Sequence, residues 1–180
     1  MTNLLEETLA AATKDGPARL RNDAPDVILP EGAELRYAAV RMDDRGSLME
    51  VLRNSDEPDT PIEQVYTVSV RPGLVKGWAL HKLHDDRYFI LSGDLLVVLY
   101  DVRPESKTCG QIFKLVLSGN RPAMLRIPAN VWHADHNVGT SDVLMLNLPT
   151  MEYDLEDPDK FRLPIDTDLI PYSFGAASGW

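Results

Sequence analysis

The four histidines are the residues most suited to chemistry, and they fall in two pairs, His81/His84 and His133/His136. A neutral imidazole can remove a proton near pH 7 or bind a metal ion. Residues three apart on a regular strand point to opposite faces, so we expect one histidine of each pair to face inward. Two inward imidazoles from different strands can then meet, whereas all four can meet only if a strand breaks. A structural role is about as common as a chemical one at the places of His81 and His133, and it is the commoner one for His84 and His136.

Composition limits the class of protein that can carry these histidines. The 180 residues fit one domain, and 44% hydrophobic with 26% charged residues is typical of a soluble globular chain. A net charge of −10 argues against a nucleic-acid partner. The longest apolar run, Leu95 to Tyr100, is too short to cross a membrane, and the N-terminus lacks a basic leader. Cys109 stands alone, which rules out an internal disulfide. We therefore expect a cytoplasmic protein.

From residue 35 the chain consists of short runs rich in Val, Ile, Leu, Tyr and Phe, separated by Gly, Pro, Asn and Ser turns. The expected strands are 35–42, 47–53, 64–71, 74–81, 87–92, 94–103, 111–118, 123–127, 131–137 and 142–148. Many short strands without long helices favour an antiparallel sandwich or barrel.

Two further segments flank the predicted strands. An apolar stripe predicts a helix over 3–13, which Asp15-Gly16-Pro17 ends, and an irregular connector follows over 16–33. We therefore divide the chain into an N-terminal helix and connector, 1–34, and a domain over 35–180. The acidic, Pro-rich tail after Pro149 is expected to wrap the surface, with a short helical turn near Asp157 to Phe161.

One segment carries a specific motif. IPANVWHADHN, Ile127 to Asn137, resembles the second cupin motif, Pro-x-Gly-x-x-His-x-x-x-Asn. Asn130 replaces the motif's Gly, and Asn tolerates the left-handed backbone that a glycine usually supplies in such a turn.

Further stretches resemble, in order, one cupin family, the dTDP-4-dehydrorhamnose 3,5-epimerases. The matching stretches are DDRGSLMEV (Asp43 to Val51), QVYTVS (Gln64 to Ser69), KGWALH (Lys76 to His81), RYFILSGDLLVVLYDVRPESKTCG (Arg87 to Gly110) and IPANVWHA (Ile127 to Ala134). Each is weak alone, but five in the right order are strong evidence for the fold, and the resemblance extends over about residues 40 to 170, most of the domain. The resemblance implies an all-β cupin jelly-roll barrel, a homodimer, and action on a dTDP-linked 4-keto sugar without a metal or dissociable cofactor.

The same resemblance implies roles for particular residues. It gives His81 the place of the catalytic base and His133 a place in the barrel wall. Arg45 and Glu50 take places at the nucleotide end, and Gln64 takes a place beside the substrate. An aspartate of the tail pairs with the base in the family, and Asp166 or Asp168 is the expected equivalent.

The sequence departs from the family at several of these places. Trp78 stands where the family has Arg, Ala79 where it has Gly, and Asp86 where it has Lys. The late strand, 142–149, lacks the family's Tyr acid. Trp78 could stack on a base or sugar, and Arg87, Lys82 or His133 could face the developing oxyanion. The candidate acids on other strands are Tyr66, Tyr88 and Tyr100.

Three hypotheses follow. The first is an epimerase or isomerase in which His81 removes a proton next to the keto group of a dTDP-4-keto-6-deoxyhexose. A ketoisomerase, which needs no opposite-face acid, belongs to this class. The second is a metal-dependent cupin that uses His81, His84, His133 and Asp86, although the spacing differs from the usual His-x-His and Glu. The third is a non-catalytic cupin that binds a sugar nucleotide.

Overall fold

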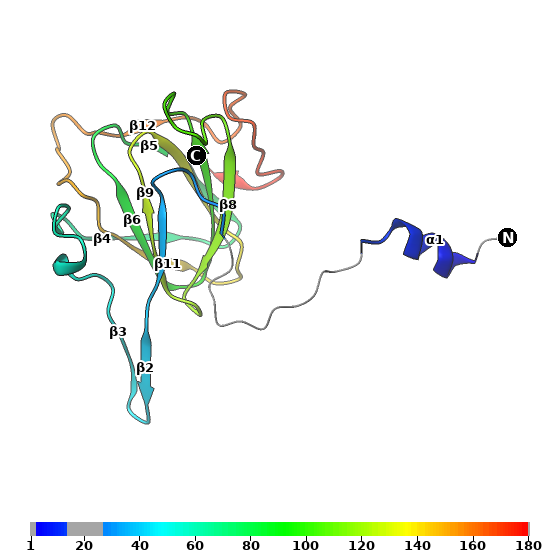
Figure 1. Cartoon of the computed structure of the whole chain (residues 1–180), viewed down its shortest axis with the longest axis horizontal. Coiled ribbons are helices and arrows are strands. Elements are labelled where there is room, and N and C mark those ends of the chain that lie inside the picture. The colour runs from blue at the N-terminus through cyan, green and yellow to red at the C-terminus, as the bar shows by residue number, and fades with distance from the viewer. Residues whose placement is uncertain (1–2, 14–26, 180) are drawn as a thin grey trace.

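The computed structural model describes residues 3–13 and 27–179, and most of their strands form two facing, largely antiparallel sheets (Figure 1). The first sheet has the strand order β1 (Glu34–Tyr37), β9 (Ala123–Ile127), β6 (Asp86–Ser92), β11 (Val143–Asn147) and β4 (Tyr66–Val70). The second has the order β12 (Phe161–Arg162), β5 (Leu74–Leu80), β10 (Val131–Asn137), β7 (Asp94–Asp101) and β8 (Ile112–Ser118). Strand β13 (Ser178–Gly179) runs parallel to β5. The all-β jelly-roll prediction is confirmed.

Three smaller elements lie outside the two sheets. Strands β2 (Val40–Asp43) and β3 (Gly46–Met49) form a hairpin that protrudes from the barrel (Figure 1). The 3-10 helix η1 (Asn54–Asp56) follows it. Helix α1 (Leu4–Ala11) begins at a capping box in which Asn3 accepts from the amide of Glu6. Among the described residues, no helix has the length and hydrophobicity needed to cross a bilayer.

The strand predictions are accurate from residue 64 onward, where each expected strand matches an observed one to within two residues. The expected strand 35–42 is instead divided into β1 and β2, and 47–53 shortens to β3. The predicted helical turn near Asp157 to Phe161 is wrong, because this part of the tail is extended and enters β12. The predicted helix end at Asp15-Gly16-Pro17 and most of the connector lie outside the described residues.

The core fills the space between the sheets with alternate residues of each strand. Strand β8 shows the pattern: Phe113, Leu115 and Leu117 are buried while Lys114 and Val116 are exposed. The remaining buried members of this cluster are Val70, Tyr88, Ile90, Leu95, Val97, Leu99, Leu125, Ile127, Val131, Val143 and Met145. Side chains that point into the barrel are therefore packed between the two sheets.

The tail covers the outer face of the second sheet. Trp78 on β5 is buried there and packs against the rings of Tyr172 and Phe174, with centroids 6.4 and 5.7 Å away. We expected Trp78 to contact the substrate. Strand alternation instead turns it away from the barrel interior, since its neighbours Gly77 and Ala79 line the interior pocket.

Arg87 also has a structural role in place of the predicted contact with substrate. Its side chain is fully buried, and all its N–H groups are used. Nε donates to the carbonyl of Leu148 at 2.6 Å, and Nη1 donates to Glu57 at 2.8 Å. The carbonyls of Thr60, Pro61 and Pro149 accept from the two Nη atoms. Arg87 therefore fastens the segments around residues 57–61 and 148–149 to β6.

We predict that Arg87→Met destabilises the fold, because it leaves Glu57 and several carbonyls without their donor. Breaking a buried ion pair typically costs about 3–5 kcal/mol, and chemical denaturation measures it. Arg36→Met is the control, since exposed Arg36 approaches the same Glu57 only at 3.9 Å and should cost about 1 kcal/mol or less. Equal losses for the two variants would contradict the assignment.

Candidate active site

The two predicted inward histidines meet in a pocket between the sheets. This inner pocket has a volume of about 160 Å³ and receives side chains from β4, β5, β6, β10 and β11 and from the tail. An outer pocket of about 250 Å³ lies beside it. Tyr66, His81 and Lys160 line both pockets and mark their junction. A ligand that occupied both would therefore pass these three side chains.

Asp86 is the centre of the inner pocket. It begins β6 in the first sheet, is 2% exposed, and its Oδ2 lies 3.2 Å from Nε2 of His81 and 3.4 Å from Nε2 of His133. Its Oδ1 accepts a hydrogen bond from Asn147 Nδ2 at 2.7 Å. Burial raises the pKa of this carboxyl, but the hydrogen bond and positive charge of protonated His81, together with the hydrogen bond from Asn147, outweigh burial and hold the pKa well below its usual range. Asp86 is therefore a buried anion at pH 7.

His81 lies just beyond the last residue of β5. Its Nδ1 forms a short hydrogen bond with the carbonyl oxygen of Asp159. Because a carbonyl can only accept, Nδ1 carries a proton, and a neutral His81 has its lone pair on Nε2. When Nε2 is protonated as well, it can donate to Asp86 Oδ2, 3.2 Å away. Burial lowers the pKa of His81, but the hydrogen bond and charge of Asp86 outweigh burial and raise it. His81 is thus a strengthened base whose Nε2 faces the pocket.

The two other histidines near Asp86 have different properties. Complete burial lowers the pKa of His133 to about 4, against the opposing attraction of Asp86, so His133 is neutral at pH 7. His84 lies against His81, with ring centroids 4.2 Å apart, and its Nδ1 is 2.9 Å from Asp159 Oδ2. Burial and the neighbouring His81 lower the pKa of His84. Of these imidazoles, His81 alone is strengthened as a base.

The position of His84 departs from the prediction based on strand alternation. Because β5 ends at Leu80, the next residues turn around the Asp159 carboxylate, which accepts from the amides of Lys82 and Leu83. Alternation therefore no longer applies between His81 and His84. It does apply within β10, where His133 is buried and His136 lies on the outer face against Phe174.

The tail supplies two residues that the sequence analysis did not find. Asp159 holds His81 and His84, as described, and Lys160 projects to the junction of the two pockets. Burial lowers the pKa of Lys160, while Asp86 and Asp135 oppose this change. The pairing of β12 with Leu80 and Ala79 of β5 fixes this part of the tail. The replacement of the family's Lys by Asp86 was the signal that a cation must come from elsewhere.

Tyr66 is the best placed of the three candidate acids. Its hydroxyl accepts from Asn147 Nδ2 at 2.7 Å, and burial together with the charge of Asp86 raises its pKa to about 12. Tyr88 also lines the inner pocket but is buried, and Tyr100 packs under the tail on the outer face. Tyr66 therefore keeps its proton at pH 7 and faces the junction of the pockets.

Of the other predicted site residues, one lines the outer pocket with His81 and two lie on or beside the protruding hairpin. Gln64 does line the outer pocket, and its side chain accepts from the amide of Tyr153 at 3.0 Å. Arg45 is at the tip of the β2–β3 hairpin and pairs with Asp43, and Glu50 pairs with Arg53 at its base. Neither lines the two pockets of its own chain.

The predicted pairing of Asp166 or Asp168 with His81 is not what the structure has. Both aspartates are exposed, and Asp166 lines a separate groove of the tail. The partners of His81 are Asp86 and the main chain of Asp159. A tail aspartate does lie near the base, at Asp159, but its carboxylate pairs with His84 and only its carbonyl contacts His81.

The residues of the predicted metal set are divided between two groups. His81, Asp86 and His133 form one, and His81, His84 and Asp159 form the other; within each, one ligand atom per residue lies within 4.8 Å of the rest. In both groups the close atoms are the partners of the hydrogen bonds and ion pairs given above. The four-residue set of His81, His84, His133 and Asp86 is not assembled.

Residues 41–161 match the family described as the polysaccharide biosynthesis C-terminal domain. The chain belongs to this family. It is 37% identical over 145 residues to the probable low-salt glycan biosynthesis epimerase Agl13 of Haloferax volcanii, which covers 79% of this chain and 93% of that protein.

Solved structures agree with this assignment. A dTDP sugar isomerase from Desulfovibrio desulfuricans G20 superimposes with a TM-score of 0.76 and 28% identity, covering 84% of this chain and 97% of that one. The dTDP-4-dehydrorhamnose 3,5-epimerase of Bacillus anthracis has the same fold, with a TM-score of 0.72 and 17% identity over 86% and 94% of the chains. The predicted resemblance to this epimerase family is confirmed at the level of the fold.

We predict that Asp86→Asn lowers the pKa of His81. The carboxylate is the largest influence that raises that pKa against burial, so its removal leaves only the hydrogen bond to the Asp159 carbonyl to oppose burial. NMR titration of the imidazole Cε1–H signals should show the His81 transition at lower pH in the variant, while that of His136, on the outer face of β10, stays in place. An unchanged or raised His81 pKa would contradict the pairing.

Proposed function

We propose that the protein is a carbohydrate epimerase or isomerase in which His81 removes a proton next to the keto group of a dTDP-4-keto-6-deoxyhexose. The observation that carries this proposal is the state of His81, whose Nδ1 is held by a carbonyl while Nε2 faces the pocket beside a buried carboxylate. The relatives named above, an epimerase and a dTDP sugar isomerase, support the reaction class and the type of substrate.

The first step places the substrate's α-carbon against Nε2 of His81. The C–H proton moves to Nε2, and its electron pair forms the double bond of an enolate, whose negative charge collects on the keto oxygen. Asp86 stabilises the imidazolium that results, as an adjacent carboxylate does in other proton-transfer sites. The base is regenerated when a proton returns to carbon.

The enolate oxygen requires a positive or hydrogen-bonding partner, and we assign this role to Lys160. It is the lysine at the junction of the two pockets, next to His81 in the lining of both. It replaces the candidates Arg87 and Lys82. All the guanidinium N–H groups of Arg87 already donate to carbonyls and to Glu57. The Lys82 ammonium lies over the ring of Phe161, 5.7 Å from its centroid.

Return of the proton decides the product. Tyr66 holds a proton at pH 7 and lines the same junction, so it can protonate the carbon from a second direction and invert the centre. If the C3 hydroxyl passes its proton to the C4 oxygen, return of the proton from His81 to C4 makes C3 the carbonyl carbon and gives a ketoisomerase. The position of the carbonyl in the product therefore separates the two reactions.

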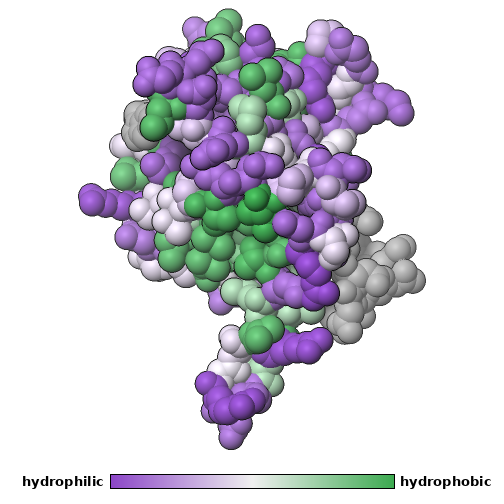
Figure 2. All heavy atoms as spheres, turned by 90° about the vertical axis from the view of Figure 1, so that its left-hand side faces the viewer, coloured by the Kyte–Doolittle hydropathy of each residue, from purple (hydrophilic) through white to green (hydrophobic). Residues whose placement is uncertain are grey.

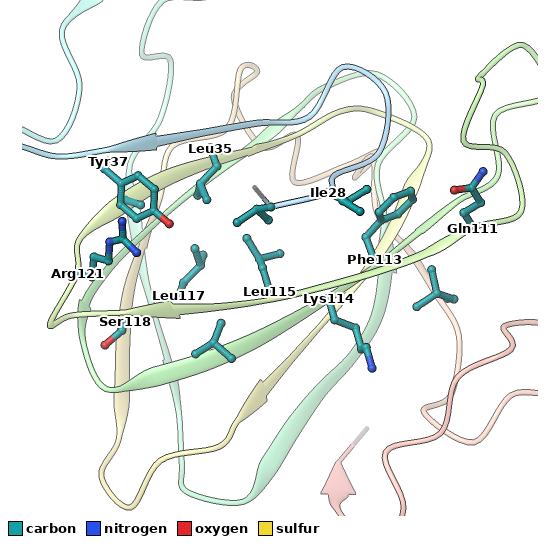
Figure 3. Close-up of a pocket in the computed structure, with 14 residues that line it drawn as sticks. Ile28, Leu35, Tyr37, Gln111, Phe113, Lys114, Leu115, Leu117, Ser118 and Arg121 are labelled. Atoms are coloured by element: carbon teal, nitrogen blue, oxygen red, sulfur yellow. The ribbon is translucent and has the colours of Figure 1, made fainter. Parts of the chain in front are cut away.

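We also propose that the working form is a cytoplasmic homodimer that binds neither nucleic acid nor membrane. Strands β1 and β8 are sheet edges, and an open groove of about 750 Å³ separates them. Figure 3 shows Leu35 of β1 and Phe113, Leu115 and Leu117 of β8 directed into this groove. Its described lining has no histidine or carboxylate, which suits a protein contact better than catalysis.

A second surface supports the same assembly. Figure 2 shows hydrophobic side chains gathered on the barrel beside the base of the protruding hairpin. On the hairpin itself, Val40, Met42 and Leu48 are exposed, Met42 at 80%. Apolar surface of this kind marks protein contacts. The single Cys109 is an exposed free thiol, as is usual in a reducing compartment.

We predict that the protein exchanges an α-proton of dTDP-4-keto-6-deoxyglucose with solvent. Proton NMR in deuterated water should show loss of the C3 or C5 signal. Loss at C5 indicates an epimerase, loss at C3 fits both reactions, and a carbonyl that moves from C4 to C3 identifies a ketoisomerase. His81→Asn should abolish this exchange, and His136→Asn should retain it. Full exchange by the His81 variant, or bound substrate without exchange by the wild type, would overturn the proposed reaction.

Lys160→Met should lower the turnover number by about 10²–10³, which is the usual effect of removing one oxyanion partner, with little change in thermal unfolding. Lys107→Met is the control, because Lys107 is exposed and approaches Glu31 only at 3.9 Å. Steady-state kinetics on the same substrate measures both variants. Wild-type turnover in Lys160→Met would remove Lys160 from the mechanism.

A further inference from the structure

The inner pocket contains a second buried carboxyl, Asp135, that the proposed proton transfer does not use. It lies on β10 two residues after His133, so both side chains point to the barrel interior. The pairing of β10 with β5 shifts register between these two residues. Two strand residues span about 7 Å, so Asp135 lies deeper in the barrel than the His81–Asp86–His133 cluster.

Asp135 differs from the other buried aspartates in its hydrogen bonds. Asp86 is held by Asn147 and the imidazoles, and Asp101 accepts from Arg103, Ser106 and Thr108. Asp135 interacts with the hydroxyl of Tyr88, but its Oδ1 has no hydrogen-bond partner among the described residues. Unpaired buried carboxyl oxygens are rare because burial without a partner is costly. This oxygen belongs to a side chain that lines the pocket.

The charged and titratable groups around Asp135 come from every neighbouring element. They are Tyr66 on β4, Lys76 on β5, Asp86 and Tyr88 on β6, His133 on β10, and Lys160 and Arg162 in the tail. Burial and the negative charge of Asp86 raise the pKa of Asp135 to about 7, against the two lysines. Asp135 can therefore either donate or accept a hydrogen bond with a neutral polar group.

We propose that Asp135 binds a hydroxyl group of the hexose through its unpaired Oδ1 and so selects the sugar. This inference rests on the proposed function, because it assumes that the sugar enters the inner pocket. With the reacting carbon at His81 Nε2, the far side of the ring points toward Asp135. The neighbouring floor residues Val68 and Met145 are apolar and offer the sugar no hydrogen bond. A sugar without a hydroxyl at this place would leave the carboxyl unpaired and bind less well.

The test compares Asp135→Leu and Asp135→Asn with the wild type. Two probes are used: dTDP-4-keto-6-deoxyglucose, for its KM and exchange rate, and dTDP alone, for its dissociation constant by calorimetry. Asp135→Leu should raise the KM by roughly 10-fold or more, and Asp135→Asn, which keeps polar atoms of the same length, should restore most of this loss. The affinity for dTDP should be the same in all three proteins, because dTDP carries no hexose.

His136→Asn is the matched control, because the next residue on the same strand faces the outer surface. If Asp135→Leu does not fold, Asp135→Ser replaces it, since serine is polar but too short to reach the sugar. A wild-type KM in the leucine or serine variant would overturn the proposal, as would an equal loss of affinity for dTDP. If the proposed reaction is wrong, the wild type binds the sugar nucleotide without exchanging a proton. The affinities of the wild type and the Asp135 variants for that sugar nucleotide then still test the role of Asp135.

Discussion

The buried carboxylate of Asp86, placed between two imidazoles, is the interaction on which the site depends. It joins the sheets, because Asp86 begins β6 in the first sheet while His133 lies on β10 and His81 follows β5 in the second. A buried anion is tolerated only when its hydrogen bonds are satisfied. Asn147 donates to one oxygen and protonated His81 can donate to the other, so the barrel can keep a negative charge in its interior. That charge strengthens His81 as a base and keeps the tyrosine beside it protonated.

The C-terminal tail completes this arrangement from outside the barrel. Its pairing with β5 sets the carbonyl of Asp159 against His81 Nδ1, which decides the nitrogen that holds the proton. The same segment carries Lys160 to the junction of the pockets. Farther along, Tyr172 and Phe174 pack on Trp78 across the outer face of β5. Strand β5 thus lines the inner pocket on one face and packs against the tail on the other.

The sequence predicted this molecule well wherever strand alternation decides where a side chain points. The strands from residue 64 onward, the inward His133 and the outward His136 all follow from a period of two. Alternation failed at His84 because β5 ends one residue before His81, and a loop has no period. Arg87 was given the wrong role, and Asp159 was missed, for another reason. Their roles depend on backbone carbonyls and amides from distant segments, and side-chain patterns carry no record of such partners.

The departures from the epimerase family form a consistent set when their charges are considered together. Asp86 replaces a lysine of the family, which removes a cation from the pocket and adds an anion. Lys160 brings a cation back from the tail, and Asp86 takes over the support of the base, so the pocket again holds an imidazole, a carboxylate and an ammonium. A protein that only bound a ligand would gain little from burying these groups, since buried ion pairs rarely add stability over apolar packing. The retained combination of charges favours catalysis with relocated residues over the non-catalytic hypothesis.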